Sequence, residues 1–306
     1  MVREDGEFDE DDCAELLKVY TRGERLGCGR QGQVFVLKGA RSYAGKMFRS
    51  GREAGRELRL MSKLRPCAGV VSLTGFVRER SGGACYGTMV MELCGPSLCH
   101  RLIKGGPLGE EEAAKTIQRL AETLKEIHSR GIVHRDLKPE NIFVKLDASA
   151  VHEVVIGDFG VATDDIKEMS QYCGTGKYMA PEVASCKGGH GDGSSQSLYT
   201  KAVDVWALGV IAYELLRGYK LPQQIELLRG GVFPDGSPVS DEAEDLICGM
   251  LAVEPSERLT LDGVLEHPWI VGNCKIETMS RRRRCGVKRS APGHGSDLVV
   301  KKIRAA

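Results

Sequence analysis

Short apolar runs separated by turn residues dominate the first part of the chain and predict strands. Residues 20–50 form several such runs, and residues 70–77 and 87–93 form two more of strand length. Further along, apolar residues recur every three or four positions, which predicts helices. The predicted helices cover residues 53–64, 110–130, 241–252 and 260–266, and another begins at Asp204.

Composition is that of an ordinary soluble globular protein, but the charge is unevenly distributed. The 306 residues are 42% hydrophobic and 28% charged, with a formal net charge of +1. Residues 1–18 carry eight acidic and two basic side chains, whereas residues 275–306 carry ten basic and two acidic ones. We therefore expect residues 1–19 to be an acidic mobile segment and residues 271–306 a basic, disordered tail. The Gly- and Ser-rich residues 185–198 predict a flexible insertion.

Neither a membrane span nor a secretion signal is predicted. No run of eighteen apolar residues occurs, and the acidic N-terminus lacks the basic and apolar regions of a signal peptide. The eleven cysteines are scattered without a paired CxxC framework, which favours reduced thiols. We therefore expect a protein of the cytoplasm, the nucleus or both, with no membrane partner.

The tail contains a basic cluster, Arg281–Arg284, followed by Lys288 and Arg289. Such a cluster is typical of a nuclear import signal or a nucleic-acid patch, and a solvated tail is the third interpretation. Because no aromatic residues are interleaved with these charges, a nuclear import receptor is preferred over nucleic acid as the partner.

The octapeptide from His134 to Asn141 gathers polar groups suited to phosphoryl transfer. Asp136 can orient an incoming hydroxyl, Lys138 can neutralise charge on a transferring phosphoryl group, and Asn141 offers an amide oxygen to Mg²⁺. Seventeen residues later an apolar strand ends in Asp158-Phe159-Gly160, which supplies a second metal-binding oxygen group. A charged surface turn is the alternative for Asp-x-Lys alone, but not for both motifs at this spacing.

A glycine-rich segment, Leu26–Val34, precedes these motifs with the pattern GxGxxGxV. Glycines let backbone amides approach phosphate oxygens without a Cβ in the way. A Rossmann dinucleotide site is the competing interpretation, but it needs a helix after the glycines. Here strand-like runs flank them, and the next run, residues 43–48, contains Lys46 between apolar residues.

Together these motifs resemble those of eukaryotic serine/threonine protein kinases over about residues 20–270. The resemblance implies an α+β, bilobal protein-kinase fold, with a small antiparallel-sheet N-lobe at about residues 20–93 and a larger helical C-lobe at about residues 95–270. It also implies ATP and Mg²⁺ as cofactors and protein substrates with Ser or Thr hydroxyls. Glu140 adds an expectation of basic residues before the phosphorylated site.

The closing His267-Pro268-Trp269-Ile270 is typical of the calcium/calmodulin-dependent kinase group. Within it, the chain looks most like plant calcium-dependent-kinase relatives without EF-hands, the phosphoenolpyruvate-carboxylase-kinase-related kinases. No D-x-[DN]-x-[DN]-G calcium loop occurs in the sequence, so no direct calcium control is expected.

The resemblance also assigns roles to single residues. Asp136, Lys138 and Asn141 would be catalytic, and Asn141 and Asp158 would bind the metal. Glu57 is expected to pair with Lys46, and Glu53, one turn earlier, is the alternative. The residues expected around ATP are Leu26, Gly27, Gly29, Gly32, Val34, Ala44, Lys46, Glu57, Met91, Glu92, Cys94, Phe143 and Asp158.

Residues 161–179 resemble an activation segment, in which Thr175 would contact Asp136 and Lys138. The segment also contains three carboxylates. One hypothesis is that they pair with Arg135 and order the segment without phosphorylation; solvated loop charge is the alternative. These carboxylates belong to Asp164, Asp165 and Glu168.

Two further contacts are implied, one between Asp204 and the backbone of the catalytic octapeptide and one between Arg258 and Glu182. A pseudokinase scaffold that binds nucleotide without turnover is the competing function. Only eleven positions separate Lys46 from Glu57, and no acidic residue follows Glu92 to Cys94, whose backbone the resemblance implies is the hinge beside adenine. Both departures motivate that alternative, and the intact catalytic residues argue against it.

Overall fold

A computed structural model describes residues 20–29, 32–48, 50–81, 84–186, 198–219, 227–228 and 239–274. The predicted acidic segment, most of the predicted insertion and residues 275–306 of the predicted tail lie outside the described residues. Within the described residues, no helix is long and apolar enough to cross a membrane.

A five-stranded antiparallel sheet forms the N-lobe, with strand order β1-β2-β3-β5-β4. In the register of β3 and β5, Ala44 lies opposite Met91 and Lys46 lies opposite Met89. The sheet consists of β1 (Thr21–Cys28), β2 (Gly32–Lys38), β3 (Tyr43–Phe48), β4 (Leu73–Ser81) and β5 (Ala84–Glu92).

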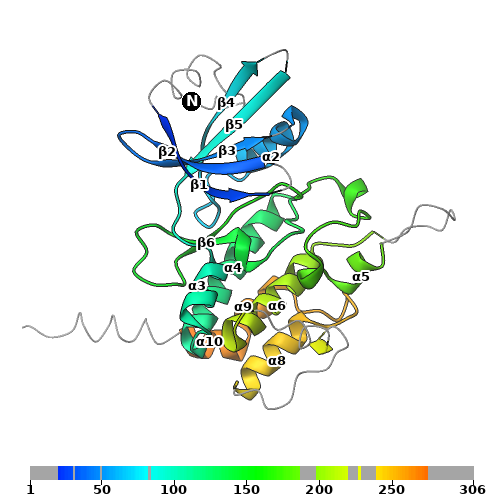
Figure 1. Cartoon of the computed structure of the whole chain (residues 1–306). Coiled ribbons are helices and arrows are strands. Elements are labelled where there is room, and N and C mark those ends of the chain that lie inside the picture. Colours follow the sequence, from blue (N-terminus) through cyan, green and yellow to red (C-terminus); the bar gives the residue numbers. More distant parts are fainter. Residues whose placement is uncertain are drawn as a thin grey trace, which may run out of the picture. The chain divides into compact units, whose positions relative to one another are not determined.

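One helix, α2 (Gly51–Lys63), packs against this sheet (Figure 1). Its apolar side is buried through Ala54, Leu60 and Met61. Ser50 occupies the N-cap position but makes no side-chain capping bond, and the helix contains two glycines. The helix is therefore held mainly by its contacts rather than by its own sequence.

Helices form the C-lobe, and its two longest ones, α4 and α6, pack on each other. Helix α6 is apolar and buried on almost all of its sides, because it lies in the core between α4 and α8. A two-stranded antiparallel sheet, β6 (Ile142–Val144) with β7 (Val154–Ile156), follows α4. The helices are α3 (Leu98–Gly105), α4 (Glu110–Ser129), α5 (Pro181–Ala184), α6 (Ala202–Arg217), α8 (Asp241–Met250), α9 (Leu261–Glu266) and α10 (Pro268–Cys274).

The antiparallel sheet and the helical lobe confirm the predicted α+β bilobal fold. One main apolar core continues from α2 into α4 and α6, so the two lobes share it. The structure differs from the prediction at the C-terminal boundary of the kinase domain, which was placed at residue 270. Helix α10 continues to Cys274, so residues 271–274 of the predicted tail are helical.

Candidate active site

The octapeptide of residues 134–141, here called the catalytic loop, has a strained backbone supported by a buried carboxylate. Arg135 has a φ of 64°, in the left-handed region that costs a non-glycine residue about 1–2 kcal/mol. Asp204, in α6, accepts hydrogen bonds from the backbone N–H groups of His134 and Arg135, each at 2.9 Å. Its Oδ2 also lies 2.8 Å from Nε2 of His128 in α4. The two long helices thereby fix the loop, as expected for Asp204.

The carboxylate of Asp136 is held on both of its oxygens. Lys138 Nζ donates to Oδ2 at 2.7 Å, and Thr175 Oγ1 donates to Oδ1 at 2.7 Å. Lys138 Nζ also lies 2.6 Å from Thr175 Oγ1, so the activation segment closes onto the catalytic loop as predicted. Asn141 turns its amide nitrogen toward the carbonyl oxygen of Asp136 at 2.9 Å, which leaves its amide oxygen for another ligand.

Lys46 joins the two lobes through two carboxylates. Its Nζ lies 2.7 Å from both carboxylate oxygens of Glu57 in α2, and 2.7 Å from Oδ1 of Asp158. Glu57 rather than Glu53 therefore makes the pair, across a sequence spacing of only eleven residues. Asp158 itself has a φ of 59°, a conformation that Asp tolerates better than most residues. The pseudokinase alternative rested partly on this short spacing. The structure shows that the spacing does not prevent the ion pair between Lys46 and Glu57.

Burial and charge act in opposite directions on the pKa values of this trio. Burial raises the pKa of Glu57, and the nearby Asp158 adds to this effect against the opposing effect of Lys46. Burial acts to lower the pKa of Lys46, but the two carboxylates hold it above its ordinary value. Burial likewise acts to raise the pKa of Asp158, but the Lys46 ammonium brings it below its usual range. Lys46 is therefore a cation and Asp158 an anion at neutral pH.

The glycine-rich turn between β1 and β2 offers space that the protein itself does not fill. A Cβ added at Gly32 would lie 1.9 Å from the carbonyl oxygen of Met47, so close strand packing explains that glycine. A Cβ added at Gly27 or Gly29 would meet nothing within 4 Å. Open space beside bare backbone fits a loop that approaches phosphate oxygens, as the predicted nucleotide requires.

The apolar residues predicted around adenine come from both lobes. Ala44 and Met91 face each other across β3 and β5, while Val34 on β2 lies opposite Lys46. Leu26 is in β1 and half exposed. Phe143 is in β6 and lies beside Gly157, away from this strand pairing.

Glu92 and Cys94, at and after the end of β5, are both expected to contact ATP, but their backbone N–H groups differ in whether the protein already binds them. The N–H of Glu92 donates to the carbonyl oxygen of Ser72 at 2.9 Å, and its Oε1 accepts from the Ser72 N–H at 2.6 Å. The Glu92 N–H is thus engaged within the protein. The N–H of Cys94 has no partner among the described residues, and burial raises the pKa of its thiol to about 12. Of Glu92 and Cys94, only Cys94 thus keeps a backbone N–H without a partner among the described residues.

Asn141 and Asp158 carry the side-chain oxygen atoms that are expected to bind a metal ion. The backbone brings them together, because the N–H of Gly157 donates to the Asn141 carbonyl oxygen at 2.8 Å. No cluster of three or more His, Cys, Asp or Glu side chains suited to a metal exists among the described residues. Two oxygen groups without a full protein cage fit Mg²⁺, which usually keeps waters and shares its coordination with substrate phosphates.

The three acidic residues of the activation segment do not share one partner. Glu168 Oε2 lies 3.5 Å from Nη2 of Arg135, so this part of the hypothesis agrees with the structure. Asp164 instead binds Arg59 of α2 through two hydrogen bonds of 2.6 and 2.7 Å. Asp165 accepts a bond from a backbone N–H two residues on. Neither of these two reaches Arg135.

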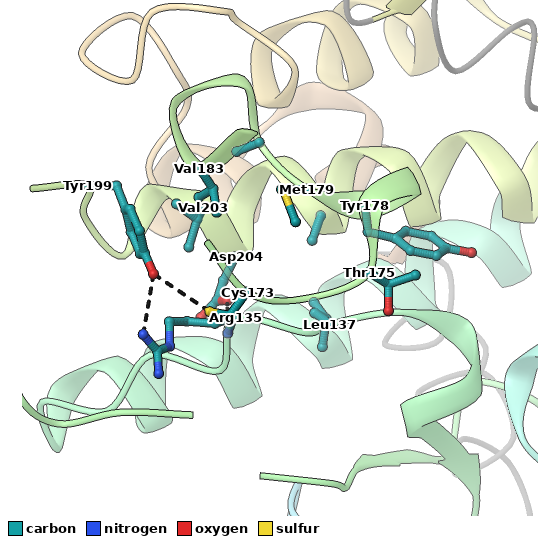
Figure 2. A pocket seen from close by; sticks show the side chains of 12 residues that line it. Arg135, Leu137, Cys173, Thr175, Tyr178, Met179, Val183, Tyr199, Val203 and Asp204 are labelled. Atoms are coloured by element: carbon teal, nitrogen blue, oxygen red, sulfur yellow. Dashed lines mark hydrogen bonds between the residues drawn. The ribbon is translucent and has the colours of Figure 1, made fainter. Parts of the chain in front are cut away.

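Figure 2 shows the pocket beneath this segment, where Arg135 and Tyr199 meet. Arg135 Nη1 donates to Tyr199 Oη at 3.2 Å and to the carbonyl oxygen of Glu168 at 2.8 Å. Tyr199 Oη also lies 3.7 Å from Sγ of Cys173. Arg135 thus ties the catalytic loop to the activation segment mainly through backbone oxygens, and it also binds the hydroxyl of Tyr199.

Arg258 pairs with Glu182, as the sequence resemblance implies, and it contacts both carboxylate oxygens. Its Nη1 and Nη2 lie 2.7 and 3.1 Å from the two carboxylate oxygens. Four further residues make contacts in or beside the site that no sequence pattern predicted. A surface arginine, a histidine at a helix end and a tyrosine in a loop are common in proteins without any special role. The residues missed in this way are Arg56, Arg59, His128 and Tyr219.

Comparison with known proteins agrees with this geometry. A model of the protein kinase domain matches residues 20–270. Calcium/calmodulin-dependent protein kinase type 1 of Caenorhabditis elegans is 33% identical over 286 residues, which cover 85% of this chain and 76% of that protein. Serine/threonine-protein kinase H1 of Homo sapiens is 36% identical over 265 residues, which cover 79% of this chain and 58% of that protein.

Proposed function

The chain belongs to the protein kinase family and is a serine/threonine protein kinase, and on that basis we propose how its residues share the reaction. Asp136 orients a Ser or Thr hydroxyl of a protein substrate toward the γ-phosphate of ATP, and Lys138 neutralises charge as it develops. Lys46 holds the α- and β-phosphates, and Glu57 fixes Lys46. The double anchoring of Asp136 by Lys138 and Thr175 is the observation that best supports this assignment.

Mg²⁺ is the metal that this proposal requires. Asn141 and Asp158 would hold it, and when bound it supplies positive charge against the β- and γ-phosphates. The free amide oxygen of Asn141 and the anionic Asp158 support this assignment.

The decisive variant is Asp136→Asn, which keeps the size of the side chain but removes its charge. We expect phosphate transfer to a Ser/Thr peptide to fall at least about a hundredfold, in line with the loss of the carboxylate that orients the reacting hydroxyl and can accept its proton. Binding of a fluorescent ATP analogue should change little, because Asp136 does not contact the nucleotide in this proposal. Asp147→Asn, an exposed change on a nearby turn, is the matched control. Retained transfer in Asp136→Asn would refute the role.

Substrate preference follows from the environment of Glu140. Tyr219 Oη donates to Glu140 Oε1 at 2.5 Å, but the other oxygen, Oε2, is buried without a hydrogen-bond partner among the described residues. The nearby carboxylate of Glu214 is already engaged by Lys177 and Tyr178. Because a buried carboxylate oxygen without a partner is costly, a cation from the substrate would satisfy it. We therefore propose a preference for one basic residue before the phosphorylated Ser or Thr.

A positional peptide library measures this preference directly. In Glu140→Gln we expect the advantage of an arginine-containing peptide to fall by about tenfold, as the loss of a charged hydrogen bond implies. The kcat for a peptide without basic residues should stay near the wild-type value. An unchanged arginine preference would place the basic subsite elsewhere.

We also propose the kinship with plant calcium-dependent-kinase relatives that lack EF-hands. The closing His267-Pro268-Trp269-Ile270, which is typical of the calcium/calmodulin-dependent kinase group, supports the broader part of this kinship. The same turnover should then be measured with Ca²⁺ and calmodulin as with a calcium chelator, and activation by calmodulin would argue against this kinship.

For location, we propose that the basic tail directs the chain to the nucleus through an import receptor, with the cytoplasm as its other compartment. The cluster Arg281–Arg284 without interleaved aromatic residues supports this proposal.

A further inference from the structure

Helix α2 is tied to the activation segment by the carboxylate of Asp164. Arg59 forms two hydrogen bonds with it, from Nη1 at 2.6 Å and from Nη2 at 2.7 Å. Lys63, one helical turn later, lies 2.5 Å from the same carboxylate. Asp164 is mostly buried by these contacts, and they hold its pKa far below the usual range of a carboxyl group. One anion therefore binds two cations of α2.

A second carboxylate, that of Glu168, adds a parallel connection. Its Oε2 binds Arg56 of α2, and Arg56 also donates to the carbonyl oxygen of Ala162 at 2.9 Å. Thr163 Oγ1 donates to the same Glu168 oxygen at 2.6 Å, and Arg135 of the catalytic loop approaches it at 3.5 Å. Glu168 thus brings together α2, the activation segment and the catalytic loop.

The cations on α2 share one side of the helix. Arg56, Arg59 and Lys63 are spaced by three and four residues, which places them on one face. Glu57 follows Arg56 directly and points into the protein, where it is 1% exposed and bonded to Lys46. The two carboxylates therefore restrain the rotation and position of the helix that carries Glu57.

Such a restraint matters because the inward position of α2 has an intrinsic cost. Glu57 loses its hydration when buried and lies near a second anion, Asp158. The helix start is weak, as Ser50 makes no side-chain capping bond. An isolated exposed ion pair contributes little, but here three cations and two carboxylates act on one helix.

We propose that Asp164 and Glu168 are positioning residues, whose carboxylates hold α2 where Glu57 reaches Lys46 and so keep the kinase active without phosphate on the activation segment. The inference rests on the proposed roles of Lys46 and Glu57 in binding ATP. These two side chains already provide anions to the cations that a phosphate would otherwise pair with.

The test uses the full chain after phosphatase treatment and removal of the phosphatase. For each variant, the kcat, the KM for ATP, the thermal midpoint and the hydrogen exchange of residues 51–63 are measured. Asp164→Asn should lower kcat by about three- to tenfold and speed exchange in α2, because the inward helix becomes less populated. Arg52→Ala is the matched control, since Arg52 is exposed on the same helix and makes no ion pair within the described part of the chain.

A charge swap separates positioning from a merely structural role. Asp164→Arg alone should lower kcat and protection, and Arg59→Asp added to it should restore at least half of both losses. If Asp164 variants fold poorly, the double variant Arg59→Ala with Lys63→Ala removes the same contacts from two half-exposed side chains. Activity should persist in the phosphatase-treated wild type.

Three results would overturn the inference: wild-type kcat and exchange in Asp164→Asn, no rescue by the swap, or loss of turnover after phosphatase treatment of a chain that is active before it. Failure of the proposed function looks different. A wild-type chain that transfers no phosphate before treatment contradicts the assigned catalytic roles, whereas the exchange of α2 still reports on the ion pairs.

Discussion

The carboxylate of Asp204 meets three donors in a space with almost no solvent. It accepts from two backbone N–H groups of the catalytic loop and lies against His128. Three neighbours on two oxygens match a carboxylate but not an amide, which has one acceptor and one donor group. The strained Arg135 backbone is stable only because these bonds outweigh its cost.

We therefore expect Asp204→Asn to lower the free energy of unfolding by about 1–3 kcal/mol, the cost of leaving a buried donor without an acceptor. Urea unfolding followed by tryptophan fluorescence measures this change. The kcat should fall as well, because the loop that carries Asp136 loses its support. Wild-type stability in this variant would show that the loop is held by other contacts.

The pH dependence of this contribution has a definite sign. Burial acts to raise the pKa of Asp204, but the hydrogen bond with His128 and the nearby charges hold it below the ordinary 3.8. The unfolded chain therefore takes up the proton first as pH falls. The stabilisation is fully present above about pH 4 and is lost as pH falls through the folded-state pKa. The stability difference between wild type and Asp204→Asn should accordingly be constant above about pH 4 and shrink as the pH falls below it, toward the folded-state pKa of Asp204.

The activation segment as an element depends on one glycine. Gly174 has a φ of 97°, and a Cβ there would lie 2.5 Å from the carbonyl oxygen of Arg135. Only glycine lets the segment run this close to the catalytic loop. Thr175, the next residue, can then donate to Asp136.

We expect Gly174→Ala to move the segment away from the loop and to lower kcat by about tenfold or more, since about 1–2 kcal/mol of backbone strain adds to the clash. The KM for ATP should change less, because the nucleotide residues lie elsewhere. Gly176→Ala is the matched control, as a Cβ there meets nothing within 4 Å. Equal kcat values for the two variants would contradict the argument.

Elements differed in how far the sequence could predict them. The helix of residues 110–130 has an apolar stripe and a clear end, and α4 follows it to within one residue. The start of α2 was placed too late, because its glycines and its missing capping bond give no start signal. Its position depends on tertiary contacts instead.

Site residues within motifs could be predicted, because local spacing fixes their relation. The resemblance of their motifs to those of protein kinases placed Lys46, Asp136 and Asp158 in one site. Contacts such as that between Arg59 and Asp164 could not be predicted, since 105 residues separate the partners and neither belongs to a distinctive motif. Such contacts exist only once the fold has brought α2 beside the activation segment.

At the scale of the whole molecule, the proposal that the basic tail directs the chain to the nucleus can be tested directly. A fluorescent protein fused to residues 275–306 should accumulate in the nucleus, because a compact basic cluster binds import receptors. Replacement of Arg281–Arg284 by glutamine is the control that removes the charge but keeps the length. A cytoplasmic signal from the unchanged fusion would remove the nuclear proposal.

The anchoring of the catalytic loop by α4 and α6 has a consequence for how activity could be interrupted. No contact described for Asp204 involves α2, so an outward swing of α2 would separate Glu57 from Lys46 and leave the loop intact. Helix displacements of this kind take microseconds to milliseconds, whereas local unfolding of a segment can take up to seconds. Phosphate transfer interrupted in this way would resume as soon as the helix returns, because the catalytic loop would not have to refold.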